Sequence, residues 1–307
     1  MLEITAIETD DDLQGALDLM ASIYPERALM LAEFRGQQSA YPDHALFQAL
    51  EEERLVGWSR VVVEPRLRKQ KLASSQIVVA TDARRRGTGT ELYRAVSDWG
   101  RSNGLEQLEG QVKEGEDESL SWVERRGFRQ TGRDSLLELD LTAIEPAELD
   151  LPAGVEIVRW IERPDLIAGM YEVACEASPD IPGATDDAMD SYEDWLAHDM
   201  TAPGDKPEAT FVALADGEVI GYAKFSLTDA QPKTAYHDLT GVKRAWRGRG
   251  VAGALKRAEI RWAKENGYEK ASTMNEERNA PIRKLNERYG YRPASGRIFV
   301  RGPLAPP

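Results

Sequence analysis

The feature that most constrains the fold of this chain is an internal repeat. When the 307-residue sequence is aligned with itself, without gaps, so that Arg84 falls on Arg247, many residue types coincide between Val79 and Gly127 and their counterparts. In this alignment, which we call the repeat alignment, Gly87 falls on Gly250, Trp99 on Trp262, and Gly127 on Gly290. Chance seldom places tryptophans and several glycines in register over such a distance. The sequence therefore predicts two copies of one domain.

A stretch rich in helix- and strand-breaking residues separates the two copies. Residues 141–154 read LTAIEPAELDLPAG, with two prolines and a glycine that interrupt regular structure. We therefore expect an N-terminal domain over residues 1–145 and a C-terminal domain over residues 154–307. Each copy opens with a short strand, and a helix follows its later strands. The later strands are expected at 45–50, 54–63 and 73–80 in the first copy, and at 209–215, 218–227 and 235–242 in the second.

The composition indicates a soluble globular protein and argues against several classes of function. Hydrophobic residues make up 41% of the chain and charged residues 30%. The formal net charge of −14 argues against general binding to nucleic acids or to anionic membranes. The start lacks a signal-peptide pattern, and no stretch has the roughly 20 apolar residues that cross a bilayer. Cys175 is the only cysteine and the three histidines are scattered, so we expect a cytoplasmic protein with no metal site.

A basic, glycine-rich turn follows the third of these strands in each copy. Residues 239–258 contain six lysines or arginines and no acidic residue, although the chain as a whole is acidic. A strand, a tight turn and a helix form an anion site, because the first N–H groups of the helix lack partners and lie at its positive end. We therefore expect the turn to hold an anion, with at least one of Arg247 and Arg249 as a ligand.

Several kinds of nucleotide-binding loop contain glycines at such a turn. A P-loop requires Lys followed by Ser or Thr, which neither copy has. Residues 248–253 fit the G-x-G-x-x-G pattern of dinucleotide-binding loops, but the corresponding residues of the first copy do not. Both copies share the hexamer R-x-x-G-x-[GA], at residues 84–89 and 247–252.

This hexamer and its surroundings resemble the signature of the GCN5-related N-acetyltransferases, the GNAT family. The second copy has Val242, the hexamer, a helix, a strand, Asn279 and the pair Gly290-Tyr291 in the family's order. The resemblance covers both copies and implies an α/β fold with two GNAT-like acyl-CoA N-acyltransferase domains in tandem. It implies in each domain a mixed, largely antiparallel sheet that splays between its fourth and fifth strands. It further implies acetyl-CoA as acyl donor and a small amine as acceptor.

The resemblance also assigns the contacts to acyl-CoA at equivalent positions of the two copies. Backbone N–H groups of residues 248–252 are expected to bind the pyrophosphate, and Val242 to begin the stretch that pairs with pantetheine. The expected contacts of the second copy are Val242, Arg247, Gly248, Arg249, Gly250, Val251, Ala252, Asn275 and Asn279. Those of the first copy are Val79, Arg84, Arg86, Gly87, Thr88 and Gly89.

Catalytic candidates lie on the strand before the second turn. Strand alternation places Tyr236, Asp238 and Thr240 on one face, with His237 on the other. Asp238 is the expected base. Counted back from the arginine of the hexamer, Tyr236 and Asp238 both fall where some family members have catalytic residues.

The position at which the family usually has its general acid differs in this sequence. Asn286 stands where the family usually has the Tyr that protonates the thiolate of coenzyme A. An amide can hydrogen-bond the sulfur but cannot deliver a proton, so water, Tyr289 or Tyr291 remain as acids. In the first copy, Glu116 stands at the position of the family's Asn and Val123 at that of its Tyr.

We therefore expect the C-terminal domain to be active and the N-terminal domain to be catalytically degenerate. Two other functions remain open, namely non-catalytic acyl-CoA binding or sensing and a nucleotide-cofactor enzyme. A monomer or a homodimer without nucleic-acid or membrane partners is expected.

Overall fold

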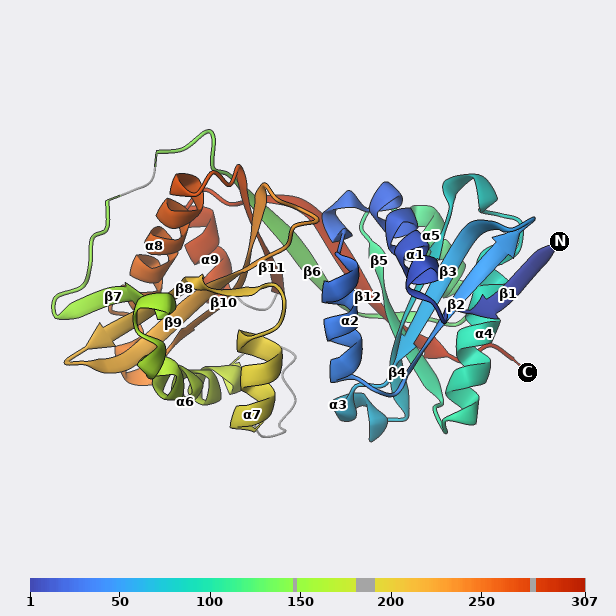
Figure 1. Ribbon diagram of the computed structural model, residues 1–307, viewed down its shortest axis with the longest axis horizontal. Helices are drawn as coiled ribbons and strands as arrows, with labels where there is room; N and C mark the ends of the chain where they lie inside the picture. The colour runs from blue at the N-terminus through green and yellow to red at the C-terminus, as the bar shows by residue number, and fades with distance from the viewer. Residues whose placement is uncertain (146–147, 181–190, 277–279, 307) are drawn as a thin grey trace. The chain divides into compact units, whose positions relative to one another are not determined.

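The computed structural model describes residues 1–145, 148–180, 191–276 and 280–306 (Figure 1). The chain forms two compact units. Unit 1 comprises Met1–Arg133 with Gly296–Pro307, and unit 2 comprises Asp134–Ser295. These units differ from the domains expected from the sequence, 1–145 and 154–307, at their C-terminal ends. The reason is that the last strand of each half forms hydrogen bonds in the unit built by the other half.

The first half of the chain contains six strands. They are β1 (Leu2–Ala6), β2 (His44–Glu51), β3 (Arg54–Val62), β4 (Leu72–Val79), β5 (Gln107–Lys113) and β6 (Arg129–Asp140). Its α-helices are α1 (Asp10–Ile23), α2 (Leu31–Ala40), α3 (Pro65–Arg68), α4 (Thr88–Ser102) and α5 (Asp117–Glu124). Short 3-10 helices follow α1 and β4, η1 (Pro25–Arg27) and η2 (Thr81–Ala83).

The second half repeats this order. Its strands are β7 (Val155–Arg159), β8 (Asp205–Ala215), β9 (Glu218–Leu227), β10 (Thr234–Val242), β11 (Lys270–Glu276) and β12 (Arg292–Pro303). Its α-helices are α6 (Ile167–Ala177), α7 (Tyr192–Trp195), α8 (Val251–Glu265) and α9 (Ala280–Arg288). Short helical turns are η3 (Trp160–Glu162), η4 (Pro164–Leu166), η5 (Ser178–Asp180), η6 (Leu196–Met200) and η7 (Arg244–Trp246). The described helices include none that is long and apolar enough to span a membrane.

The sequence repeat is confirmed as a structural repeat. The repeat alignment places helix α4 on α8, strand β5 on β11, and strand β6 on β12. Both α4 and α8 begin after a glycine in the left-handed region, Gly87 with φ of 97° and Gly250 with φ of 88°. Glycine adopts this conformation without the steric cost that a Cβ brings, so the turn and the start of the helix are encoded locally.

Each unit has a mixed sheet, as the resemblance implied. The strand order is β1-β2-β3-β4-β5-β12 in unit 1 and β6-β11-β10-β9-β8-β7 in unit 2. In unit 1, β4 and β5 run parallel and pair only from Leu72–Ser74 to Gln107–Glu109 before they diverge. In unit 2, β10 and β11 pair in parallel only from Thr234–Tyr236 to Lys270–Ser272. The expected splay between the fourth and fifth strands is therefore present in both units.

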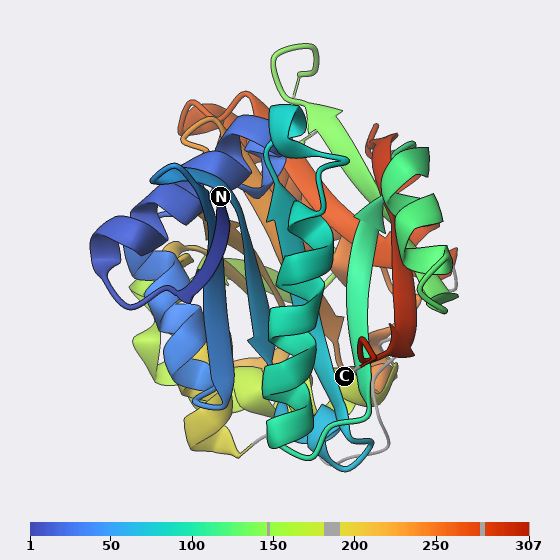
Figure 2. The ribbon, with the colours of Figure 1, turned by 90° about the vertical axis from the view of Figure 1, so that its right-hand side faces the viewer.

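Alternating side chains on the central strands create two core layers in each unit. In unit 1, Trp58 packs with α1 and α2, whereas Val56, the extra residue at a β-bulge in the pairing with β2, packs with Leu92 of α4. Figure 2 shows α4 lying across the near face of this sheet. In unit 2, Val212 packs with α6 and Phe211 with α8, and Figure 1 shows these helices on opposite sides of β8 and β9. The turn before α4 or α8 thus opens at the end of a well-packed sheet face.

Candidate active site

The glycine turn of unit 1 is open in front of helix α4. A Cβ built on Gly87 would meet no atom of the described residues within 4 Å. The Nε of Arg84 donates to the carbonyl oxygen of Val79 at 3.3 Å, which fixes the turn against the end of β4. Because Gly87 caps α4, the N–H groups of Thr88 and Gly89 belong to the first turn, where helical partners are lacking. The turn therefore presents donors and a positive helix end to open space.

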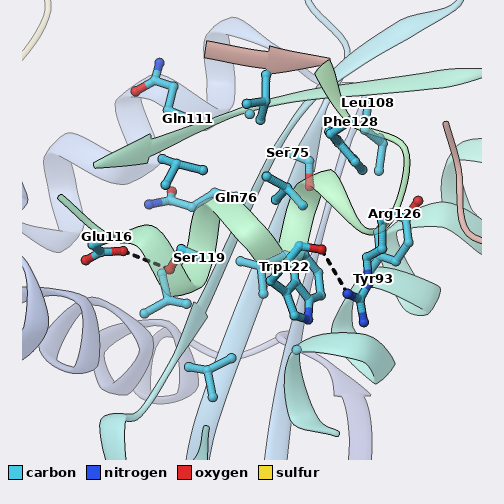
Figure 3. Close-up of a pocket in the computed structure, with 18 of the residues that line it drawn as sticks. Ser75, Gln76, Tyr93, Leu108, Gln111, Glu116, Ser119, Trp122, Arg126 and Phe128 are labelled. Atoms are coloured by element: carbon cyan, nitrogen blue, oxygen red, sulfur yellow. Dashed lines mark hydrogen bonds between the residues drawn. The ribbon is translucent and has the colours of Figure 1, made fainter. Parts of the chain in front are cut away.

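A cavity of about 660 Å³ begins at this turn and continues into the gap between β4 and β5. Its lining comes from the turn, from both edges of the gap and from α5. The residues include Ser74–Val79 of β4, Leu108–Lys113 of β5, and Arg84, Arg85, Gly87, Gly89 and Thr90 of the turn and of α4. Figure 3 shows Glu116 with Ser119 toward one end, Tyr93 with Arg126 toward the other, and Trp122 between them.

Helix α5 supplies the wall opposite the turn. The Arg126 guanidinium lies 3.7 Å from the centre of the Trp122 ring and donates to Thr90 Oγ1 at 2.7 Å. The Trp122 ring would lie 3.6 Å from a Cβ built on Gly89. Burial lowers the pKa of Arg126. Because the ordinary pKa of an arginine is very high, the group stays cationic. With Arg85, which pairs with Glu118, it brings positive charge to the start of α4.

The other end of the cavity contains a hydrogen-bonded carboxylate. Glu116 Oε2 accepts from the Tyr24 hydroxyl at 3.0 Å and from Ser119 Oγ at 3.0 Å. Burial, and then the adjacent Glu116 charge, raise the pKa of Tyr24 to about 12, so this hydroxyl remains a donor at neutral pH. Arg27, Arg60 and other charged side chains line the same region. We call this region the acceptor end, because a carboxylate and hydroxyl groups that could face an amine lie there.

The equivalent turn of unit 2 is also exposed over residues 247–250, but other parts of the same unit contact it. A Cβ on Gly250 would lie 3.6 Å from Pro152, and the Nη1 of Arg247 pairs with Asp180 at 2.6 Å. The basic stretch contains no acidic residue of its own, and η5 supplies one from a distant part of the sequence. Arg249 lies over the Trp246 ring at 4.9 Å.

Tyr289 also contacts the first turn of α8. Its hydroxyl donates to the carbonyl oxygen of Gly253 at 3.1 Å and accepts from Arg257 at 2.6 Å. Asn286 is fully buried and donates to Asn275 Oδ1 at 3.4 Å, with Asn275 also buried. The two amides that the sequence assigned to acyl-CoA contact each other in this structure.

The catalytic candidates on β10 lie around a β-bulge at Asp238. The bulge adds one residue between His237 and Leu239 relative to β9, so the alternation expected for a regular strand does not hold. Thr240 Oγ1 lies 2.7 Å from His237 Nε2, on the same side as His237 and not opposite to it as expected. Asp238, with its side chain 41% exposed, pairs with the buried Lys224 at 2.9 Å. Lys224 also pairs with Asp205 at 2.6 Å.

A buried polar cluster lies behind β10, composed of His237, Lys256 and Glu259. His237 Nδ1 is 3.1 Å from Glu259 Oε2, and all three side chains are nearly or fully inaccessible to solvent. Burial lowers the pKa of His237 and that of Lys256, the latter to about 8, and raises the pKa of Glu259. We refer to these three residues as the buried cluster of unit 2.

The remaining sequence-predicted residues lie at or near the two turns. Thr88 is buried, and Arg86 lies 3.7 Å from Glu51. Val79 ends β4 and lines the cavity. In unit 2, Val242 and Val251 are buried, Ala252 is half-buried, Gly248 has φ of 72°, and Tyr236 pairs through its backbone with Ser272. Asn279 lies outside the described residues.

Sequence reasoning missed the side chains that complete the unit 1 cavity. Tyr24 and Arg27 follow α1, Arg60 lies within β3, and Arg126 follows α5. No local motif marks the first three, because the fold brings them together from separate elements. The repeat alignment places Arg126 on Tyr289 and could have drawn attention to that difference between the copies. No group of three or more His, Cys, Asp or Glu suited to a metal ion occurs among the described residues.

Comparison with known proteins agrees with this fold. A tandem GNAT protein from the clavulanic acid biosynthesis pathway, without AcCoA, is 21% identical, with a TM-score of 0.80 over 100% of both chains. A GCN5-related N-acetyltransferase from Sphaerobacter thermophilus is 19% identical, with a TM-score of 0.74 over 99% of this chain and 96% of that one. A glucosamine N-acetyltransferase region of a fungal multi-domain β-N-acetylglucosaminidase is 15% identical, with a TM-score of 0.72 over 98% of this chain and 38% of that one.

These identities show a shared fold, and no curated protein matches the chain in sequence. The sequence model of the acetyltransferase (GNAT) family matches residues 13–128 and again residues 167–291. The two matches together cover more than half of the chain, so the chain belongs to the GNAT family of acetyltransferases, as a member with two such domains in tandem.

Proposed function

We propose that this chain is an N-acyltransferase that binds acetyl-CoA in the cavity of unit 1 and acylates the amine of a small molecule. The observation that carries the proposal is the continuity of this cavity from the Gly87 turn into the gap between β4 and β5. The family match supports acyl transfer as the chemistry. The domain expected from the sequence to be active was the second, but the cavity that begins at the Gly87 turn favours unit 1 as the acyl-CoA site.

The residues of unit 1 fit an acyl-CoA substrate. The N–H groups at the start of α4 and the guanidinium of Arg126 suit the pyrophosphate. Beyond Ser74, β4 has left β5 while it still pairs with β3, so one backbone edge is available to hydrogen-bond the pantetheine amides. Gly89 and Gly110 keep side chains out of this path.

The reaction forms one C–N bond and breaks one C–S bond. The neutral amine attacks the thioester carbonyl, and coenzyme A leaves as a thiolate that takes up a proton. An alkyl ammonium with a pKa of about 10 must first lose a proton to solvent, and the attacking amine must then lose another. We assign this second proton to Glu116, because both hydroxyl donors bind Oε2, and among the described residues nothing bonds to Oε1.

The test is calorimetric titration of acetyl-CoA into the wild type, Gly89→Glu and Ala252→Glu. The repeat alignment makes these two positions equivalent, each in the first turn of its helix. A carboxylate there favours the helix dipole, and a Cβ on Gly89 meets only ordinary contacts of 3.6 Å or more. The fold is therefore expected to persist, while the new charge repels the pyrophosphate.

We expect one site in the wild type, weakened about 100-fold or more by Gly89→Glu because like charges in a binding site cost several kcal/mol. Ala252→Glu is expected to bind like the wild type. Loss of binding in Ala252→Glu alone would place the site in unit 2, and two sites would make both units functional. An absence of binding in the wild type would contradict the proposal.

A second candidate, non-catalytic acyl-CoA binding, is favoured by Val123, which lines the cavity where the family pattern has its acid. Turnover with a panel of amines separates the two functions. If Glu116 accepts the proton, Glu116→Gln is expected to lower kcat by about 100-fold or more, with acetyl-CoA binding retained.

A further inference from the structure

The acceptor end of the unit 1 cavity contains two guanidinium groups that form no ion pair with a carboxylate of the described residues. Arg27 and Arg60 both line the cavity. The Nη2 of Arg27 donates to Gln111 Oε1 at 3.3 Å, and the Arg60 guanidinium lies 5.3 Å from the centre of the Phe34 ring. Across the described ranges of the chain, no acidic group forms an ion pair with either arginine.

The carboxylates nearby are bound to other groups. Glu26 pairs with Lys113 at 2.6 Å, and Glu64 accepts from Ser74 Oγ at 3.1 Å. Glu116 accepts from two hydroxyls, as described above. The acceptor end therefore combines one carboxylate that faces the reaction with two cations that no described carboxylate contacts directly.

Arg27 and Arg60 are also partly removed from water. Burial lowers the pKa of both. The charge of Arg297 lowers the pKa of Arg27 further, against smaller opposing effects of Glu26 and Glu116, and for Arg60 the charge of Glu64 opposes burial while Arg27 adds to it. Both groups stay cationic, because an arginine side chain does not lose its proton in proteins. Desolvated like charges that lie near each other are unfavourable unless an anion joins them.

We propose that the acceptor is an amine that also carries a carboxylate, of the amino acid class, and that Arg27 and Arg60 bind this carboxylate. This inference rests on the proposed function of unit 1 and specifies its substrate. A guanidinium presents paired donors that match both oxygens of a carboxylate. The carboxylate bound there leaves the amine free to face Glu116 and the thioester.

The experiment compares amino acids with the amines that lack their carboxylate. Acetyl transfer is measured for pairs such as alanine with ethylamine, phenylalanine with phenethylamine, and lysine with cadaverine. The enzymes are the wild type, Arg27→Gln, Arg60→Gln and the conservative Arg60→Lys. Arg54→Gln is the matched control, because Arg54 lies on the same strand as Arg60 but forms an exposed pair with Asp82.

We expect the wild type to prefer the amino acid of a pair, with a KM at least about 10-fold lower. Arg27→Gln and Arg60→Gln are expected to remove this preference through KM with little change in kcat. Arg60→Lys should restore part of it, and Arg54→Gln should behave as the wild type. Acetyl-CoA affinity is the check on folding of unit 1 and is expected to stay constant in all variants.

The binding of N-acetylated amino acids to the complex of the wild type with coenzyme A provides a readout besides turnover. Their carboxamides, which lack the negative charge, are expected to bind more weakly by about 10-fold or more. Equal use of both members of each pair, or equal binding of acids and amides, would overturn the inference while the proposed function stands. Failure to bind either product in a protein that binds acetyl-CoA would also overturn it. Failure to bind acetyl-CoA would instead refute the proposed function.

Discussion

At the start of α4 in unit 1, a side chain added to Gly87 would meet no described atom within 4 Å, whereas at the start of α8 one added to Gly250 would lie 3.6 Å from Pro152. The two turns have the same hexamer and nearly the same backbone, and in both an arginine donates to the last carbonyl of the preceding strand. The motif thus encodes a strand, a turn and a helix in both units. Both turns are exposed, but in unit 1 a cavity continues from the turn, whereas in unit 2 Pro152 and Asp180 contact it.

The side chains that α4 and α8 direct into the interiors of the two units also differ. Tyr93 and Val96 of α4 pack in an apolar cluster beside the cavity of unit 1. Their counterparts in the repeat alignment are Lys256 and Glu259, which are fully buried and belong to the buried cluster of unit 2. Buried charged groups are stabilised by one another, so their positions are tightly coupled. This comparison suggests that unit 2 conserves the fold of a GNAT domain around a closed interior, and three predictions test it.

The largest effect is expected from truncating Lys256. Lys256→Ala removes a fully buried side chain and the positive charge that acts on Glu259, so we expect a loss of about 3–5 kcal/mol in the free energy of unfolding. Urea unfolding measures it. Lys233→Ala, at a surface lysine paired with Glu269, is the control and should cost at most about 1 kcal/mol. Similar losses in both variants would mean that the buried cluster does not stabilise unit 2.

A smaller effect is expected from alkaline pH. Burial lowers the pKa of Lys256 to about 8 in the folded chain, against an ordinary value of 10.5. Between these two values the unfolded chain binds a proton that the folded chain does not, so the free energy of unfolding rises with pH, by at most about 3 kcal/mol.

Lys256→Met keeps the volume of the side chain and lacks this titration, so it serves as the reference. Unfolding of both proteins is measured at about pH 7 and about pH 10, and the difference between them isolates Lys256. A relative loss of stability in the wild type over this interval would contradict the direction of the shift.

The smallest effect is expected from the two capping glycines. Gly87→Ala and Gly250→Ala each place a Cβ on a left-handed residue, which costs about 1–2 kcal/mol in either unit. Denaturant unfolding should show similar losses, since the backbone is alike and neither Cβ is crowded. A markedly larger loss in one unit would show that the two turns differ in backbone strain as well as in their contacts.

The elements around the turn were predicted well from sequence, because their signals are local. The helix expected after the second hexamer is present as α8, which begins at Val251 directly after Gly250. The regular alternation assumed for residues 235–242 was wrong at Asp238, since a bulge depends on the pairing with β9. The acidic partner of Arg247 was missed for a similar reason, as it lies in η5, far from the turn in sequence.

The sequence by itself determined that two copies of one domain exist, where each glycine turn lies, and which family the hexamers resemble. These features depend on backbone conformation and on residue spacing, which a short segment encodes. Tertiary structure alone decided where the last strand of each half pairs and that Tyr24, Arg27, Arg60 and Glu116 line one cavity. It also decided that Asp180 pairs with Arg247 at the turn of unit 2. Access and side-chain contacts between distant segments depend on packing, and packing is not written in any local pattern of residues.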